Sequence, residues 1–215
     1  MDSDEVWDAI DDQRRRTADL LEQLSDDEWS HPSLCEGWTV RDVAAHLTLQ
    51  QLTLGQAIRM ALRHPGGVNT MIRASARSRA ALPPERLVAD IRATIGSRRH
   101  NIGLTELETL IDILVHSQDI AVPLRRDLPM PTAAAATAAD RVWSTRGTGK
   151  NRVFVSVPLD GFRFTATDVD WSVGEGPEVR GPISAILLLL TGRRAALSRL
   201  SGEGAEALRG QSTPS

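Results

Sequence analysis

The sequence contains little cysteine, little lysine and no long apolar run. Cys35 is the only cysteine, which excludes an internal disulfide and a zinc site made of several cysteines. No stretch reaches the roughly eighteen apolar residues of a membrane span. The first residues, "MDSDEVWDAIDDQRRR", are acidic and then basic, and they lack the apolar core of a secretory signal. We therefore expect a cytoplasmic protein.

The charged residues give no sign of a nucleic-acid partner. The formal net charge is −3, and Lys150 is the single lysine among many arginines. Arginine suits the recognition of phosphate or carboxylate groups. Here the arginines are scattered and alanine is abundant, which is typical of a GC-rich genome, and we favour that interpretation. We expect neither nucleic acid nor membrane as a partner, and a monomer or homodimer.

Apolar residues at helical spacing predict four long helices in the first part of the chain, at residues 5–24, 40–62, 83–99 and 105–122. Capping boxes mark two of the starts, Thr39 with Asp42 and Thr105 with Glu108. The stripe of the second helix consists of Val40, Val43, Ala44, Leu47, Leu54 and Ile58. Helices of this kind in close succession favour a helix bundle.

The pattern changes near residue 129. An alanine-rich helix is followed by "RVFVSV" and "FRFTATD", which alternate as strands do, then by a short strand in 169–179 and an apolar helix in 182–200. We expect a mainly α protein with a small α+β part. The predicted division is a bundle at 1–128, an α+β domain at 129–205 and a disordered tail at 206–215.

The helix at 105–122 carries a polar sector that points to a metal site. Glu108, Asp112, His116 and Asp119 cluster on one side of a helix that is otherwise apolar and should be buried. Asp112 and His116, at i and i+4, can face one ion, and His46 lies on another helix of the bundle. Two histidines and a carboxylate suit zinc, nickel or another ion that binds imidazole. Asp119 is placed to orient His116.

Structural explanations remain open for these residues. Asp112 and His116 could form a buried polar pair or a solvated face, and His46 could be a core histidine. Cys35 stands just before a helix and could be a nucleophile of lowered pKa, although a small buried apolar residue is the interpretation we favour.

Arg193 and Arg194 could bind an anionic substrate group or lie on the surface. No residue is an evident general base, so the catalytic residues stay unknown.

Three motifs, in order along the chain, resemble the mycothiol-dependent maleylpyruvate isomerase family within the DinB-like superfamily. They are "WSHPSLCEGWTVRDVAAHL", "LIDILVHSQDIAVPL" and "FRFTATDVDWSVGEGPEVRGP" with the later "LLLLTGRRAAL". The resemblance implies a DinB-like four-helix bundle followed by a small α+β domain. It also implies metal ligands at His46, Asp112 and His116. Isomerase members have glutamate where this chain has Asp112.

The resemblance further implies a divalent-metal-dependent enzyme that activates a low-molecular-weight thiol, with mycothiol as cosubstrate. The expected reaction is isomerisation or S-transfer on a small electrophile, and zinc is the first candidate ion, with nickel or another as alternatives. The shorter Asp112 side chain and the lack of an evident base motivate a second hypothesis. This is a non-catalytic metal-binding or ligand-sensing module.

Overall fold

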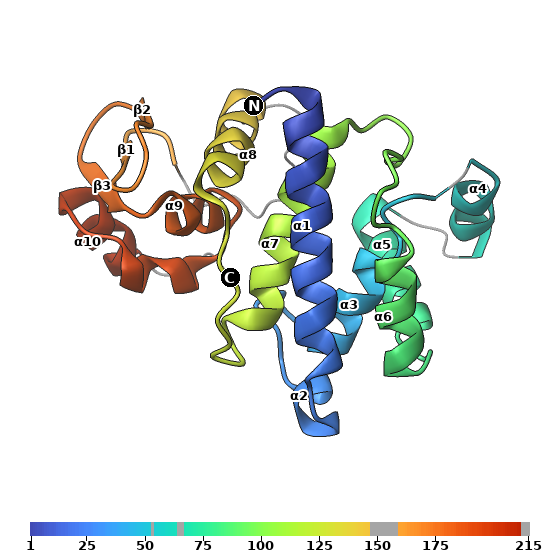
Figure 1. Ribbon diagram of the computed structural model, residues 1–215. Coiled ribbons are helices and arrows are strands. Elements are labelled where there is room, and N and C mark those ends of the chain that lie inside the picture. Colours follow the sequence, from blue (N-terminus) through green and yellow to red (C-terminus); the bar gives the residue numbers. More distant parts are fainter. Residues whose placement is uncertain (53, 64–66, 147–158, 212–215) are drawn as a thin grey trace. The chain divides into compact units, whose positions relative to one another are not determined.

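The computed structural model describes residues 1–52, 54–63, 67–146 and 159–211, and it divides into two compact units, Asp2–Pro129 and Met130–Ser215 (Figure 1). Helices make up most of the described chain, and a small three-stranded sheet lies in the second unit. The expected fold class, mainly α with a small α+β part, is confirmed. Among the described helices, none combines the length and the apolar character that crossing a membrane requires.

The first unit is a helix bundle whose two longest helices pack along each other (Figure 1). These are α1 (Ser3–Glu22) and α7 (Glu106–Ala121). Helix α3 (Val40–Leu47) packs on α7, and α6 (Pro84–Arg92) packs on both α1 and α3. The shorter helices are α2 (Asp26–Ser30), α4 (Leu54–Arg63) and α5 (Val68–Arg79).

Capping boxes define where the main helices begin. Thr39 accepts the Asp42 amide and Thr105 accepts an amide of the first turn of α7, while Asp42 and Glu108 reach back to the caps. Both boxes are confirmed. Because α3 and α7 start at fixed residues, the sequence position of each polar side chain determines which face of the bundle it lies on.

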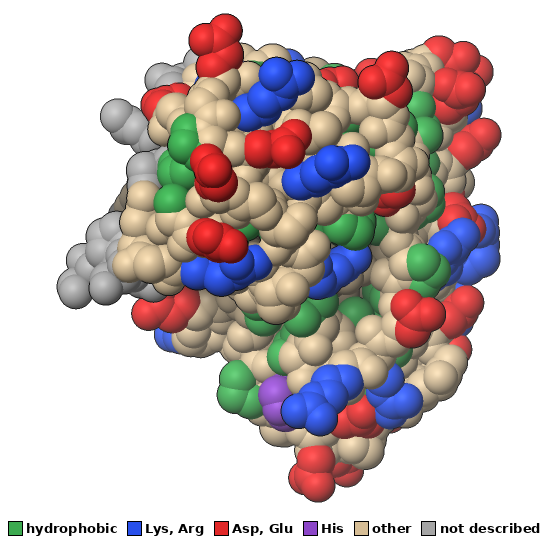
Figure 2. Space-filling view, turned by 90° about the vertical axis from the view of Figure 1, so that its left-hand side faces the viewer, with side chains coloured by type: hydrophobic (Ala, Val, Ile, Leu, Met, Phe, Trp, Pro, Cys, Tyr) green, Lys and Arg blue, Asp and Glu red, His purple; other side chains and the backbone are tan. Residues whose placement is uncertain are grey.

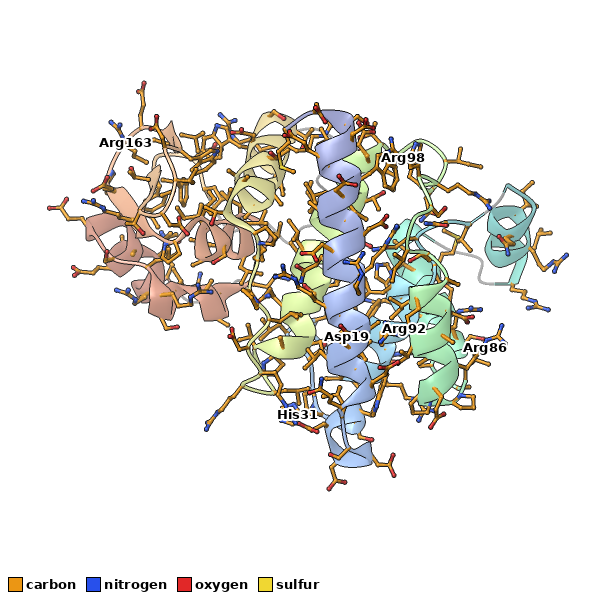
Figure 3. The ribbon with its side chains drawn as sticks, in the orientation of Figure 1. Asp19, His31, Arg86, Arg92, Arg98 and Arg163 are labelled. Carbon is orange, nitrogen blue, oxygen red and sulfur yellow. The ribbon has the colours of Figure 1, made fainter. Side chains whose placement is uncertain are left out.

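An exposed ion-pair cluster joins α1 to α6. Arg92 donates to Asp19 at 2.6 Å and to Glu22 at 2.8 Å, and Figure 3 shows Asp19 and Arg92 facing each other across the two helices. Solvent screens such a pair, so most of the stability of this contact comes from the apolar residues beneath it. These include Leu87 and Ile91, which are fully buried.

The prediction of one continuous helix over residues 40–62 is wrong, because the chain leaves the helix after Leu47 and resumes it at Leu54. Asn101 is the physical reason. Its side chain donates to the carbonyl of Leu49 at 3.1 Å and accepts the amide of Leu52 at 2.8 Å. These bonds use backbone groups that a continuous helix would pair internally. One consequence is that Ile58, expected in the core stripe, is 52% exposed.

The second unit packs helices beside a small mixed sheet. The helices are α8 (Thr132–Thr145), α9 (Ile183–Leu190), the 3-10 helix η2 (Arg194–Arg199) and α10 (Glu203–Gly210), and the strands are β1 (Arg163–Ala166), β2 (Ser172–Gly174) and β3 (Glu178–Gly181). Central β1 pairs antiparallel with β2 and parallel with β3. The expected strand "RVFVSV" lies outside the described residues.

Charges of both signs are mixed on the molecular surface. On the face in Figure 2, acidic and basic side chains are interspersed, with small apolar patches between them. The sequence has 28 acidic residues and 25 lysines and arginines, so neither sign predominates strongly.

The prediction of a disordered tail from residue 206 is wrong for residues 206–210, which complete α10. Ala205 and Leu208 are fully buried and anchor this helix. Gly204 explains how the helix approaches so closely. A Cβ at this position would lie 2.6 Å from the carbonyl oxygen of Pro177 and 2.7 Å from Val179 Cγ2.

Gly204→Ala should therefore destabilise the second unit, although alanine normally stabilises a helix relative to glycine by about 0.5–1 kcal/mol. We expect the free energy of unfolding to fall by about 1–3 kcal/mol, the usual cost of overpacking. Gly210→Ala in the same helix is the control, because no atom of the described residues lies within 4 Å of a Cβ added at that position. Chemical denaturation of both variants measures the difference. A Gly204→Ala protein as stable as the Gly210→Ala protein would contradict the packing described above.

Candidate functional site

Two helices bring three predicted site residues together. His46 lies in the last turn of α3, and Asp112 and His116 lie one turn apart on α7. Asp112 Oδ1 is 3.3 Å from Nε2 of His46 and 3.3 Å from Nε2 of His116. All three side chains are partly accessible, with 16% exposure for each imidazole and 30% for the carboxylate. The site therefore opens to small molecules from one side while resting on the bundle core.

The ring of His46 is held by its neighbours rather than by a hydrogen bond at Nδ1. Its centroid lies 5.6 Å from that of Trp38 and 4.8 Å from that of His116, both in edge-to-face arrangements. Among the described residues, no hydrogen-bond partner reaches the buried Nδ1. These ring contacts direct Nε2 of His46 towards Asp112.

The donor set fits a divalent cation. One carboxylate oxygen and two imidazole nitrogens can each offer a ligand atom, and these atoms lie within 4.8 Å of one another. A tetrahedral zinc site with bonds of about 2.0–2.1 Å separates neighbouring ligand atoms by about 3.3–3.4 Å. The two nitrogen–oxygen separations of 3.3 Å match that spacing and exceed the usual length of a charged hydrogen bond. Three protein donors would leave a position open for an exogenous molecule.

Asp119 lies behind His116. Its Oδ2 is 2.7 Å from Nδ1 of His116, and its side chain is fully buried. A short hydrogen bond at Nδ1 keeps a proton on that nitrogen, so Nε2 is the nitrogen that faces Asp112 and that an ion could bind. This is the arrangement that the i, i+3 spacing of the two residues predicts.

Cys35 belongs to the same network, which the sequence did not indicate. Its thiol donates to Asp119 Oδ2 at 3.0 Å and lies 3.7 Å from Nδ1 of His116. The residue is half-buried, so the expectation of a buried apolar packing residue is wrong. The loop is held in place where the amide of Leu34 donates to the carbonyl of Asp119 at 3.1 Å. The Cys35, His116 and Asp119 group also has metal-binding donors, but two of its separations are hydrogen-bond lengths.

Gln50 is a second residue that the sequence analysis missed. Its buried amide donates to Asp112 Oδ2 at 2.6 Å, on the oxygen that does not face the imidazoles. Gln50 follows His46 by four residues, a spacing that places two side chains on one side of a helix. That spacing was the available signal, although Gln50 lies in the turn after α3 rather than in the helix.

Electrostatics couple Asp112 to the two histidines. Burial raises the pKa of Asp112, but the charges and hydrogen bonds of His46 and His116 outweigh it and hold that pKa well below its ordinary value. Burial lowers the pKa of His116, while Asp112, Asp119 and Cys35 raise it well above the ordinary histidine value. Asp112 thus favours the protonated form of His116, and the two histidines favour the ionised form of Asp112. A cation must displace that proton to bind.

Arg193 and Arg194 form local contacts in the second unit. Arg193 donates to the carbonyl of Thr191 at 2.6 Å. Arg194 donates to the carbonyls of Leu208 at 2.6 Å and Gln211 at 2.7 Å, at the end of α10. Arg194 thus stabilises the C-terminal end of a helix, and a role for either arginine in substrate binding stays a prediction.

Comparison with known proteins supports the resemblance. Residues 10–106 match the family described as mycothiol maleylpyruvate isomerase N-terminal domain, a range that contains His46 and ends before Asp112. No protein with curated annotation matches the chain.

Two solved structures have the same fold over the whole chain. The crystal structure of the mycothiol-dependent maleylpyruvate isomerase has a TM-score of 0.63 at 16% identity, covering 100% of this chain and 95% of that one. A histidine-to-alanine mutant of the isomerase has a TM-score of 0.65 at 14% identity, with the same coverage. Residues 10–106 are thus similar to the mycothiol maleylpyruvate isomerase N-terminal domain family, and the whole chain has the fold of the two solved isomerase structures.

Proposed function

We propose that this protein is a divalent-metal-dependent enzyme that activates a low-molecular-weight thiol for isomerisation or S-transfer on a small electrophile. The observation that carries the proposal is the donor set of His46, Asp112 and His116, in which one carboxylate oxygen lies 3.3 Å from two imidazole nitrogens. The matched family and the two solved structures are named for mycothiol, which makes mycothiol the first candidate thiol. Zinc is the first candidate ion and nickel the next.

The chain's own residues orient the donors and limit access of water. Asp119 accepts a hydrogen bond from Nδ1 of His116, which leaves Nε2 as the nitrogen that can bind an ion. Trp38, only 7% exposed, covers one side of His46. His46, Asp112 and His116 would hold the ion, and the chemistry it would supply there is a lower pKa for a thiol bound beside them.

Two reaction types follow from a bound thiolate. If a thiolate adds to a conjugated double bond, the adduct is an enolate in which the former double bond is single and can rotate, and expulsion of the thiolate would restore the double bond in the other geometry. If it displaces a leaving group, the result is S-transfer. In both cases the protein supplies orientation and the ionised nucleophile. Because the solved structures are maleylpyruvate isomerases, maleylpyruvate is the first electrophile to test.

A non-catalytic metal-binding or ligand-sensing module is the competing function. The observation that favours it is Asp112, whose side chain is one methylene shorter than the glutamate of the isomerase members. The enzyme and a metal-binding module both require the cation, a ligand-sensing module need not hold one, and only the enzyme consumes an electrophile.

Metal content tests the requirement that the enzyme and a metal-binding module share. We expect about one divalent ion per chain, and His46→Ala and His116→Ala should weaken zinc binding by more than the 10–100-fold typical of losing an outer partner of a ligand. His100→Ala is the matched control, because His100 is exposed and, within the described part of the chain, its ring bonds the carbonyl of Asn101 and no metal-site residue. Elemental analysis and chelator competition provide the measurement. Equal zinc binding by all four proteins would contradict the site.

Zinc affinity should depend on pH in a defined direction. The pKa of His116 is raised, so protons compete with the cation, and affinity should increase as pH rises above the ordinary histidine pKa of about 6.5. Calorimetric titration in buffers of different ionisation enthalpy should detect proton release on binding. Binding with no proton release near pH 7 would show that His116 is not a ligand.

Turnover distinguishes the enzyme from the module. The zinc-loaded protein should isomerise maleylpyruvate or transfer mycothiol to an electrophile, with a rate that depends on the thiol and is lost after chelation or in the His46→Ala variant. The reaction can be followed by absorbance and by loss of free thiol. Stoichiometric zinc without thiol-dependent consumption of any electrophile tested would support the non-catalytic module.

A further inference from the structure

The two oxygens of Asp112 have different surroundings. Oδ1 faces the Nε2 atoms of His46 and His116, each at 3.3 Å. Oδ2 accepts a hydrogen bond of 2.6 Å from Nε2 of Gln50. The side chain of Gln50 is buried, since the residue is only 6% exposed. The carboxylate is therefore held at both ends, by two imidazoles on one oxygen and an amide on the other.

The turn that carries Gln50 is fixed on both sides of the residue. The carbonyl of Leu49 accepts from the Asn101 side chain at 3.1 Å, and the amide of Leu52 donates to the same side chain at 2.8 Å. Next to Gln50, Gln51 accepts a hydrogen bond of 3.0 Å from Ser97. The backbone around Gln50 is thus held by contacts to the segment before α7. The hydrogen bond from Gln50 to Asp112 therefore comes from a fixed turn and a buried side chain.

The chemistry of the amide suits this place. A carboxylate accepts hydrogen bonds only, so the Gln50 group that faces it must be the NH2 group. The amide is neutral, so it holds Oδ2 and leaves the negative charge of the carboxylate available to attract a cation. An arginine or lysine in its place would cancel that charge. To turn both oxygens towards an ion, the carboxylate would have to bend or break this hydrogen bond.

We propose that Gln50 is a positioning residue that restricts Asp112 to binding the divalent ion through one oxygen, Oδ1. This inference rests on the proposed metal site. It assigns to Gln50 the task of keeping the short aspartate side chain in a single orientation between His46 and His116, and of leaving the open position free for a thiol.

The test compares Gln50→Met with Gln23→Met, using cobalt(II) as the probe ion. Methionine has nearly the volume of glutamine but no donor. We expect Gln50→Met to bind cobalt about 10–100-fold more weakly, the usual effect of losing an outer partner of a ligand. Its visible absorption spectrum should also change, because the carboxylate is free to turn. Gln23→Met, at an exposed position just after α1, should leave both the affinity and the spectrum near those of the unmodified protein.

A second variant and a double-mutant cycle separate positioning from structural damage. Gln50→Asn keeps the amide but shortens the side chain by one methylene, so the amide no longer reaches Oδ2 and cobalt binding should weaken by a similar factor. This variant replaces Gln50→Met if that protein does not fold. In an Asp112→Ala background, titrated with cobalt up to millimolar concentration, Gln50→Met should cost nothing further. A loss of the same size in that background would overturn the inference.

The outcomes also distinguish the two proposals. If the unmodified protein binds no cobalt, the metal site and the role of Gln50 are both rejected. If it binds cobalt, and Gln50→Met and Gln50→Asn match it in affinity and spectrum, only the role of Gln50 is rejected.

Discussion

The contact between α3 and α7 depends on one carboxylate, Asp112, between two imidazoles. Oδ1 of Asp112 is 3.3 Å from both His46 and His116, and burial strengthens the attraction by reducing solvent screening. The capping boxes fix where each helix starts, Asp119 fixes the ring of His116, and Gln50 fixes the other carboxylate oxygen. The caps thus place the two helices, while Asp119 and Gln50 set the orientations of His116 and Asp112.

Local sequence rules predicted the parts of this arrangement that depend on a single helix. Caps at Thr39 and Thr105 follow from neighbouring residues, and the spacing of Asp112 and His116 places them on one face. The polar sector on an apolar helix indicated that α7 needed a polar partner. Its identification with His46 relied on bundle topology and on the family resemblance, because nothing local links residues 66 positions apart.

The missed features all arise from contacts between distant segments. The helix break after Leu47 depends on Asn101, about fifty residues later in the chain, and helical periodicity does not detect such a contact. Helix α10 packs on the second unit through the close approach that Gly204 permits. Composition does not indicate such a contact, and residues 206–210 were therefore predicted to belong to a disordered tail. The thiol of Cys35 reaches Asp119 only because a loop folds over α7. Tertiary contacts decided each case.

The separation of His46 and Asp112 along the chain also concerns the folding equilibrium. The unfolded polypeptide offers a cation only the neighbouring Asp112 and His116, whereas the folded bundle adds a donor 66 residues away. An ion bound by all three would close a long loop and favour the native state, by about 2.7 kcal/mol at a free concentration one hundred times its dissociation constant. The supply of metal in the surroundings would then set how much of the protein persists in its folded form.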